Sequence, residues 1–187
     1  MINRLVVCDL EATCWDDKPF SVEEMDIIEI GCALVTLQGE VLDTFSTFVK
    51  PTRYPVLSAF CQSLTTIKQS DVDTAPSFAD AMALLDAWVP KEACPWASWG
   101  NYDRKQLSTQ ALREMRPSLF LQTPHINLKK AWRLSNRHKH TALQSALSFH
   151  DLQFQGVQHR GIDDAVNTAR LLAYIDNDIL IKQLEAS

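Results

Sequence analysis

Two acidic residues end an apolar run near the start of the chain, and their spacing suggests shared chemistry. Asp9 and Glu11 follow the run Leu5-Val6-Val7-Cys8, which is typical of a buried β-strand. Residues i and i+2 of a strand share one face, about 6.6 Å apart along it. Two ionised carboxylates at the edge of a core repel each other and lose hydration, which is costly without compensating cations or donors. The pair therefore predicts a divalent metal site that favours magnesium or manganese over zinc, unless both acids simply reach solvent.

A third carboxylate lies on the apolar side of a predicted helix over residues 162–175. A helical wheel places Asp164 on the apolar arc, whereas Asp163 and Asn167 fall on the polar, solvent-facing arc. An acid in the first turn of a helix can interact favourably with the helix dipole alone. An acid on a buried arc needs a partner, and a metal ion shared with the first two carboxylates would provide one.

Two further residues could complete such a site. His159 precedes Asp164 by five residues, on the segment that enters the predicted helix. A lone histidine is usually structural or merely exposed, but beside a carboxylate–metal site it could accept a proton from water near neutral pH. Asp103 follows a Gly-Asn-Tyr sequence after a short apolar segment, and it could equally cap the helix that begins there.

An α/β fold would position these residues. Strands come first and helices then alternate with a strand, so we expect one α/β domain over residues 1–187, built on a mixed β-sheet. Ser77 with Asp80, and Thr141 with Gln144, resemble capping boxes at the starts of two helices. The expected strands cover residues 5–10, 27–37, 41–49 and 96–99, with a hairpin turn at Gln38-Gly39, and the expected helices cover residues 78–89, 103–115, 141–149 and 162–175.

The charge of the chain is acidic overall but uneven. Its 187 residues include 18 Lys and Arg and 23 Asp and Glu, a net charge of −5, which excludes a protein held on nucleic acid by bulk positive charge. Residues 115–150 contain no acid, and they form either a solvated face or a groove that follows the phosphates of an anionic polymer. The basic side chains there are Arg116, Lys129, Lys130, Arg133, Arg137 and Lys139.

Cysteine usage and the N-terminal segment indicate the compartment. The five cysteines are scattered and odd in number, and no two have C-x-x-C spacing, so neither a disulfide framework nor a zinc cluster is expected. The apolar run before Asp9 is too short for a signal peptide or a membrane span. We therefore expect a cytoplasmic protein with no membrane partner.

Together, these residues resemble the DEDDh 3′–5′ exonucleases, which have a ribonuclease H-like fold. The matching pattern is Asp9-x-Glu11, then Asp103, then His159-x-x-x-x-Asp164. Within that superfamily the chain looks most like the Eri-type (enhanced-RNAi) exoribonucleases and their bacterial relatives, over nearly its whole length. The stretches that carry the resemblance are residues 9–15 (DLEATCW), 29–31 (EIG), 48–51 (FVKP), 57–61 (LSAFC), 64–67 (LTTI), 98–103 (SWGNYD) and 159–165 (HRGIDDA).

The resemblance implies a hydrolase that releases nucleoside 5′-monophosphates from a 3′ end, with two Mg²⁺ or Mn²⁺ ions per site as cofactors. Asp9, Glu11 and Asp164 would bind one ion, and Asp9 would share the second. Asp103 would act as a metal ligand largely through water. His159 would be the general base that accepts a proton from the attacking water.

The resemblance also implies a nucleic-acid partner, either single-stranded RNA and RNA 3′ ends or DNA. The implied substrate contacts are Glu11, the Ala12 backbone, His159 and Trp99. Trp15 and Phe60 are alternatives to Trp99 for stacking on a base, although such aromatic side chains more often belong to the core. The basic residues from Lys129 to Lys139 could hold upstream phosphates.

Two positions depart from the family pattern. Thr66 stands where the family usually has glycine, and Asn101 stands where an aspartate is common. Neither departure removes an expected ligand, although the first could alter a loop.

Two alternatives to an exoribonuclease remain at this point. One is a single-stranded DNA exonuclease with the same mechanism, because nothing local in the sequence distinguishes a protein that recognises the 2′-hydroxyl from one that ignores it. The other is a catalytically silent RNA-binding protein on the same fold. The retention of all five site residues argues against the second, since a binding module needs neither buried acids nor the histidine.

Overall fold

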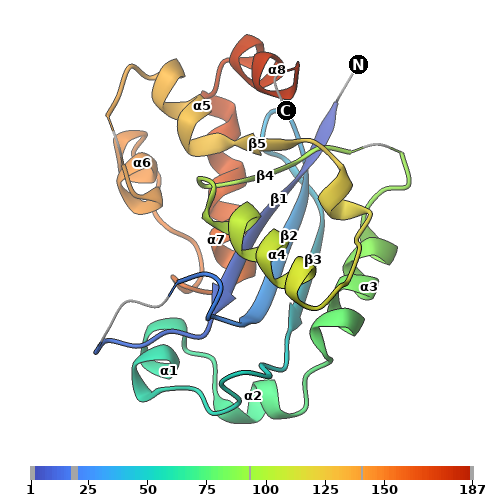
Figure 1. Ribbon diagram of the computed structural model, residues 1–187. Helices are drawn as coiled ribbons and strands as arrows, with labels where there is room; N and C mark the ends of the chain where they lie inside the picture. Colours follow the sequence, from blue (N-terminus) through green and yellow to red (C-terminus); the bar gives the residue numbers. More distant parts are fainter. Residues whose placement is uncertain (1–2, 18–20, 93, 140, 186–187) are drawn as a thin grey trace.

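The apolar run near the N-terminus forms the central strand of the sheet, β1 (Arg4–Ala12). The computed structural model describes residues 3–17, 21–92, 94–139 and 141–185. Within these ranges one five-stranded sheet has the order β3-β2-β1-β4-β5 (Figure 1). β1 is antiparallel to β2 (Ile27–Thr36) and parallel to β4 (Trp96–Ser98). The predicted mixed sheet is therefore confirmed.

The predicted hairpin joins β2 to β3 (Val41–Phe48), which are antiparallel. Gly39 in the turn adopts a φ of +85°, and its N–H donates to the carbonyl of Thr36 at 3.0 Å. A Cβ at this position would lie 2.4 Å from the carbonyl oxygen of Ala169. Glycine thus serves both the turn conformation and the close approach of a helix.

The remaining elements are short. A three-residue strand that the sequence pattern did not indicate, β5 (His125–Asn127), pairs in parallel with β4. The helices are α1 (Ala59–Thr65), α2 (Gln69–Asp73), α3 (Phe78–Trp88), α4 (Tyr102–Arg113), α5 (Leu128–Ser135), α6 (Leu143–Phe149), α7 (Gly161–Arg170) and α8 (Asn177–Glu185), with 3₁₀ helices at Phe120–Gln122 and Leu171–Tyr174. Among the described residues, no helix combines the length and apolar character needed to cross a bilayer.

Alternation along β1 divides the core between the two faces of the sheet. Leu5 and Val7 belong to a cluster that includes side chains of α5, α6 and α7. Val6 and Cys8 belong to a second cluster that includes side chains of α3 and α4. The sheet accordingly lies between two helical layers, with α4 in front of it and α7 behind it in Figure 1.

α7 rests on β1 and β2 through two glycines. A Cβ added to Gly31 would lie 2.1 Å from the carbonyl carbon of Gly161, and a Cβ added to Gly161 would lie 3.0 Å from the carbonyl oxygen of Asp9. Gly31 therefore cannot carry a side chain unless α7 moves away. This contact between main chains holds the first turn of α7 beside the end of β1.

The predicted helix starts are confirmed in one case and wrong in another. The Ser77 hydroxyl caps α3 by accepting from the Asp80 N–H at 3.2 Å, as the sequence predicts. The predicted capping box of Thr141 and Gln144 does not form, because α6 begins one residue later with Ala142 at the N-cap and no side-chain cap.

Two helices end earlier than predicted. α4 stops at Arg113 because Met115 takes a left-handed conformation (φ +50°), and the Arg116 N–H donates to the Ala111 carbonyl at 2.8 Å. This geometry is a Schellman motif. α7 likewise ends at Arg170, where the chain tightens into a 3₁₀ helix.

The polar arc of α7 is not the solvent-facing surface that the helical wheel predicts. Asn167 is fully buried. Its side-chain amide donates to the carbonyls of Gln155 at 2.7 Å and Asp163 at 2.8 Å. The segment that precedes α7 folds back over this arc, and a pattern confined to the helix cannot show that contact.

Four helices, α1, α2, α5 and α8, are absent from the sequence prediction because each has nine residues or fewer and depends on local capping or tertiary packing. α5 is an example. The Asn127 side chain caps it by accepting from the Lys130 N–H at 2.8 Å, while Leu128 and Trp132 are buried in the core. Its exposed basic residues dominate the sequence pattern and hide the two-turn apolar face.

Thr66, where the family usually has glycine, adopts a left-handed conformation. It is the C-cap of α1, with φ +62° and ψ +5°, and its side chain is exposed. This conformation is costly for a β-branched residue and free for glycine. The departure from the family pattern is thus a local strain in the loop after α1, and no site residue is involved.

We expect Thr66→Gly to stabilise the protein by about 1 kcal/mol, the scale of the left-handed penalty, which for a domain of this size raises Tm by roughly 2–4 °C. Thermal unfolding of the purified variant would measure this. The matched control is Thr74→Gly at the C-cap of α2, where φ is −102°, so glycine relieves no strain and should lower Tm or leave it unchanged. Equal shifts of Tm in both variants would show that the Thr66 backbone is not strained.

Candidate active site

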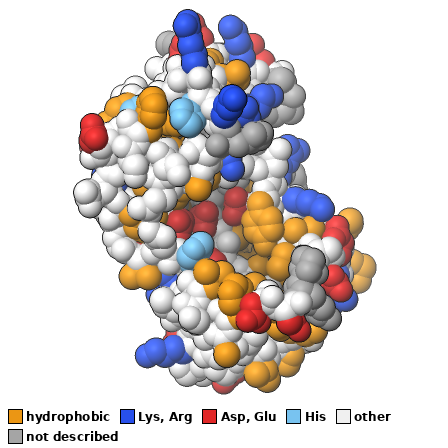
Figure 2. All heavy atoms as spheres, turned by 90° about the vertical axis from the view of Figure 1, so that its left-hand side faces the viewer, with side chains coloured by type: hydrophobic (Ala, Val, Ile, Leu, Met, Phe, Trp, Pro, Cys, Tyr) orange, Lys and Arg blue, Asp and Glu red, His pale blue; other side chains and the backbone are white. Residues whose placement is uncertain are grey.

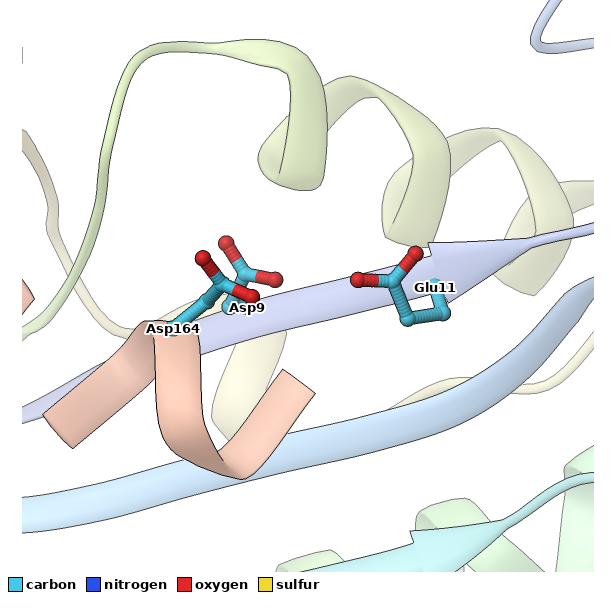
Figure 3. A group of neighbouring side chains, drawn as sticks. All are labelled: Asp9, Glu11 and Asp164. Atoms are coloured by element: carbon cyan, nitrogen blue, oxygen red, sulfur yellow. The ribbon is translucent and has the colours of Figure 1, made fainter. Parts of the chain in front are cut away.

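Three carboxylates meet where β1 ends. Asp9 and Glu11 lie on the same face of the strand as Leu5 and Val7, beyond the part that the core covers. One carboxylate oxygen of each acid and one of Asp164 lie within 4.8 Å of one another. Figure 3 shows Asp9 and Asp164 side by side, with the Glu11 carboxylate further along β1 and on the same side. The three acids that the sequence analysis groups together are thus neighbours in the structure.

The helix start places Asp164 in this cluster. The Gly31–Gly161 contact holds the first turn of α7 against the sheet, and Asp164 lies within that turn. Its Oδ2 accepts a hydrogen bond from the Arg160 N–H at 3.1 Å. One oxygen thus caps the start of α7, as expected for an acid that interacts with the helix dipole. The same carboxylate also faces the two acids of β1.

Asp103 is next to the cluster, although it is not one of its three members. It lies in the first turn of α4 and is 4% exposed. Its Oδ1 accepts from the Leu10 N–H at 3.2 Å, at the residue between the two acids of β1. This bond ties α4 to the open edge of β1 beyond its pairing with β4. A carboxylate so placed is close enough to raise the pKa of Asp9 and of Glu11.

His159 lies immediately before α7, with an exposed side chain and a left-handed backbone (φ +59°). Its charge and its main-chain N–H both lower the pKa of Asp164, which places the residue beside that carboxylate. An exposed imidazole next to the acids can exchange protons with solvent, as a general base must.

Burial disfavours the ionised forms of the acids. It is the main cause that raises the pKa of Asp9 well above the ordinary aspartate value, and the neighbouring Asp103, Asp164 and Glu11 add to the effect. Burial followed by the charge of Asp164 raises the pKa of Glu11 to about 8.

The other two acids show the same tendency. Burial raises the pKa of Asp103 to about 6, although hydrogen bonds from its own N–H, the Leu10 N–H and the Ser98 hydroxyl oppose the shift. Burial likewise raises the pKa of Asp164 to about 6, against the opposing effect of His159. Four carboxyl groups thus share one region in which ionisation is unfavourable.

The donor set fits a divalent cation. The cluster offers only carboxylate oxygens, which are the ligands of Mg²⁺ and Mn²⁺. Within the described ranges, no Lys or Arg forms an ion pair with any of the four acids. A cation would therefore supply the positive charge that the protein itself does not provide.

The surface around the acids is hollowed. Figure 2 shows acidic side chains on the floor of a depression, with histidine and hydrophobic side chains at its rim and Lys and Arg side chains beyond it. The basic residues of α5 and of the turn after it are exposed or half-buried: Lys129, Lys130, Arg133, Arg137 and Lys139. A phosphate chain that enters the depression could thus meet positive charge outside it.

The predicted substrate contacts occupy different environments. Trp99 is half-buried and packs on Trp132, with ring centroids 6.2 Å apart. Trp15 packs edge-on against Tyr54 at 4.7 Å, whereas Phe60 is 37% exposed. The Ala12 side chain is buried. Phe60 is thus the most accessible of the three aromatic side chains, and Trp99 is partly committed to the core.

The structure adds supporting residues to which the sequence analysis assigned no role. The Ser98 hydroxyl bonds Asp103 and lies 2.9 Å from Nε2 of His125, which is buried against Trp96. His125 is therefore structural. On β2, Glu29 is fully buried and binds the segment before α7. No sequence spacing reveals such contacts between distant segments.

The raised pKa values predict that the metal-free protein loses stability as pH increases. A carboxyl group with a higher pKa in the folded than in the unfolded state stabilises the fold when protonated, and this contribution disappears as pH rises through the folded value. In EDTA, Tm should therefore decline as pH rises from about 4 to about 8. Glu11→Gln should remove the part of this decline that lies nearest pH 8. Mn²⁺ should raise Tm more at the alkaline end, because it binds the deprotonated acids.

Glu40→Gln, at an exposed glutamate outside the cluster, is the matched control and should leave this pH dependence unchanged. If Glu11→Gln and wild type differ by a constant amount at every pH, the raised pKa of Glu11 is wrong.

Comparisons with known proteins agree with this geometry. The chain is 29% identical over 200 residues to the 3′-5′ exonuclease eri1 of Schizosaccharomyces pombe, covering 91% of this chain and 67% of that protein. It is 28% identical to the probable 3′-5′ exonuclease KapD of Bacillus subtilis, with 94% and 86% covered. The crystal structure of the nuclease domain of 3′hExo, a DEDDh family member bound to rAMP, superposes with a TM-score of 0.84 at 28% identity, covering 92% of this chain and 90% of that one.

Other relatives are much longer than this chain, which spans only 30% of the ERI1 exoribonuclease 2 of Xenopus laevis. The match to the exonuclease family model nevertheless extends over residues 6–172, from β1 to the 3₁₀ helix after α7. It includes every acid of the cluster as well as His159. The chain therefore belongs to the exonuclease family RNase_T, and its fold is the ribonuclease H-like fold of the DEDDh exonucleases.

Proposed function

We propose that this protein is a metal-dependent 3′–5′ exoribonuclease that releases nucleoside 5′-monophosphates. The observation that carries the proposal is the approach of Asp9, Glu11 and Asp164 within 4.8 Å, in surroundings that disfavour their ionisation. A protein that only bound RNA would gain nothing from this arrangement, which is costly in the absence of a cation. The exonuclease relatives support the same activity.

The positions of the acids support a specific assignment of metal ligands. Asp9, Glu11 and Asp164 would hold one Mg²⁺ or Mn²⁺, and Asp9 would share a second ion with Asp103 acting through water. Two such ions lower the pKa of water and neutralise negative charge on the scissile phosphate and the leaving oxygen. The hydrogen bond that the Asp103 carboxylate accepts from the Leu10 N–H would help to hold it in place for this role.

His159 would move the proton. An imidazole nitrogen accepts a proton from the water that attacks the terminal phosphorus, while the bond from phosphorus to the 3′ oxygen of the preceding nucleotide breaks. The departing 3′ oxygen takes a proton from solvent water, so the products are a nucleoside 5′-monophosphate and a chain shortened by one nucleotide with a new 3′-hydroxyl. Because the His159 side chain is exposed, it can return the proton to solvent before the next cycle.

Substrate positioning rests on contacts outside the acid cluster. Glu11 and the Ala12 backbone, at the end of β1, would contact the terminal nucleotide beside His159. Trp99 or the more exposed Phe60 would stack on a base. The basic residues of α5 and the turn after it would attract upstream phosphates, an effect that salt weakens.

RNA is the preferred substrate in this proposal because the similar nuclease domain of 3′hExo has rAMP bound and the eukaryotic relatives include exoribonucleases. Single-stranded DNA is the second candidate, since the acid cluster acts on the phosphodiester that both polymers share. Recognition of the 2′-hydroxyl would separate them.

The purified protein should release 5′-monophosphates from the 3′ end of a single-stranded RNA oligonucleotide in Mg²⁺ or Mn²⁺, and EDTA should stop the release. Asp9→Asn preserves side-chain size but removes the charge shared by both ions, so turnover should fall by about 10²-fold or more, the scale of losing one charge-stabilising group. Chromatography of the released nucleotides measures this rate.

Asp178→Asn, which changes an exposed carboxylate on α8, is the control and should turn over like wild type. Full activity in EDTA, or in Asp9→Asn, would end the metal proposal. An oligodeoxynucleotide of the same sequence that is degraded faster than the RNA would replace RNA by DNA as the substrate.

His159→Ala should lower kcat by about 10²–10⁴-fold, the usual contribution of a general base, with little change in KM. His138→Ala, at another exposed histidine, is the control. A change confined to KM would refute the proton-transfer role.

A further inference from the structure

A buried glutamate on β2 binds the segment that carries His159. Glu29 is fully buried and lies directly opposite Glu11 in the register of β1 and β2. Its Oε2 accepts from Nε of Arg160 and from the Gly161 N–H, each at 3.1 Å, and its Oε1 accepts from Nη2 of Arg160 at 3.1 Å and from the Ser46 hydroxyl at 3.4 Å. Both oxygens are thus engaged, which separates Glu29 from the three acids that face one another.

The groups that Glu29 holds directly follow His159 in the chain. The Arg160 guanidinium makes a two-pronged pair with the carboxylate and lies 5.3 Å from the centre of the Phe48 ring. The Arg160 N–H bonds Asp164. The two peptide units after His159 are therefore fixed at one end to a buried carboxylate and at the other to a member of the acid cluster.

The His159 main-chain N–H bonds Asp164, but its side chain has no such anchor among the hydrogen bonds of the described residues. Its side chain is exposed, and its φ of +59° is uncommon for a residue with a Cβ. The preceding segment also contains left-handed residues at Asp151 and Gly156, with neither helix nor strand between residues 152 and 160. A strained conformation persists only where the surroundings over-determine it. Next to the histidine, Asp164 accepts from the Arg160 N–H, and Glu29 holds the Arg160 side chain and the Gly161 N–H.

A buried ion pair of this kind is better explained by geometry than by stability. Removing two charges from water offsets most of the attraction between them, so such a pair adds little net stability but enforces one arrangement. The fork of Arg160 defines both the distance and the plane of the contact. The Gly31–Gly161 contact fixes how close α7 lies to the sheet, and the bonds to Glu29 fix the segment that enters it.

We propose that Glu29 is a positioning residue for His159: its bonds to Arg160 and to the Gly161 N–H hold the left-handed turn that aims the imidazole at the acid cluster. This inference rests on the proposed function, because it assumes that His159 takes the proton. Glu29 itself would touch neither substrate nor cation, because Arg160, Gly161 and Ser46 already occupy both of its oxygens.

The test is a double-mutant cycle of Glu29→Gln with His159→Ala, measured by nucleotide release from RNA in Mn²⁺. Glu29→Gln should lower kcat by about 10- to 100-fold with KM nearly unchanged, since a catalytic group misplaced by about 1 Å can cost 10²-fold. In the His159→Ala background the same substitution should change kcat by less than about twofold, because residues that act as a unit are not additive.

The matched control is Asp26→Asn, which alters another fully buried carboxylate. Asp26 pairs with Arg113 and accepts from the N–H groups of Thr52 and Arg53 at 2.9 and 2.7 Å, so it anchors a different loop. If Asp26→Asn lowers kcat, it should do so by the same factor in the wild-type and His159→Ala backgrounds, because its effect on the fold does not act through His159.

Hydrogen exchange in the metal-free protein gives a readout that does not depend on activity. Glu29→Gln should increase amide exchange in residues 157–161 while β1 keeps its protection, and Asp26→Asn should not increase it there. If Glu29→Gln does not fold, Arg160→Lys keeps the positive charge but loses the fork, and it enters the same cycle with the same expectation.

Four results would overturn the inference in different ways. Equal factors for Glu29→Gln with and without His159, or unchanged exchange in residues 157–161, would show that Glu29 is merely structural. A loss confined to KM would show that it acts on substrate binding instead. If wild type itself releases no nucleotide in the presence of metal, the proposed function is wrong. The wild-type assay shows this before any variant is compared, so the two failures are distinguishable.

Discussion

The unfavourable ionisation of four neighbouring carboxyl groups is the constraint on which this structure depends. Asp9, Glu11, Asp103 and Asp164 come from three elements, and burial is the first cause of every raised pKa among them. No pairing within the described chain neutralises them. A fold keeps such a cluster only when something outside the chain compensates for it, and oxygen-rich anionic sites are compensated by hard divalent cations. The acidic cluster is therefore evidence about chemistry and not about stability.

The rest of the fold holds the acids together against their repulsion. Gly31 and Gly161 bring α7 onto the sheet with no side chain between them, and Asp103 secures α4 by accepting from the Leu10 N–H. Each device acts on the main chain, so the carboxylates are placed by rigid elements and not by flexible side chains. Glu29 extends the same principle to the segment before α7, which has no regular structure of its own. A site assembled from a strand, two helix starts and one clamped turn is preorganised before any cation arrives.

The sequence predicts the parts of this arrangement that follow from local periodicity. Alternation along β1 places Asp9 and Glu11 on one face, and the helical wheel singles out Asp164 from its neighbour Asp163; the structure brings these three acids together. The same wheel is wrong about Asn167, because the segment that buries it lies outside the helix. The order of elements predicts the fold class. The sequence does not predict β5 and the short helices, because they depend on tertiary packing. Glu29 and Ser98 could be located only by contacts across the sheet, for which a single sequence carries no spacing signal.

The charge distribution reconciles an acidic protein with an anionic substrate. With a net charge of −5, the chain would repel a nucleic acid at long range, and its acid cluster would repel a phosphate at short range. Under the proposed function, cations at the cluster would turn this short-range repulsion into attraction at the scissile phosphate, and the basic residues around α5 would attract phosphates further along the strand. The protein would then attract its substrate only where a metal or a basic side chain meets a phosphate. Affinity in such a design depends on the 3′ end reaching the metal site, which favours an enzyme that acts on chain ends over one that coats its substrate.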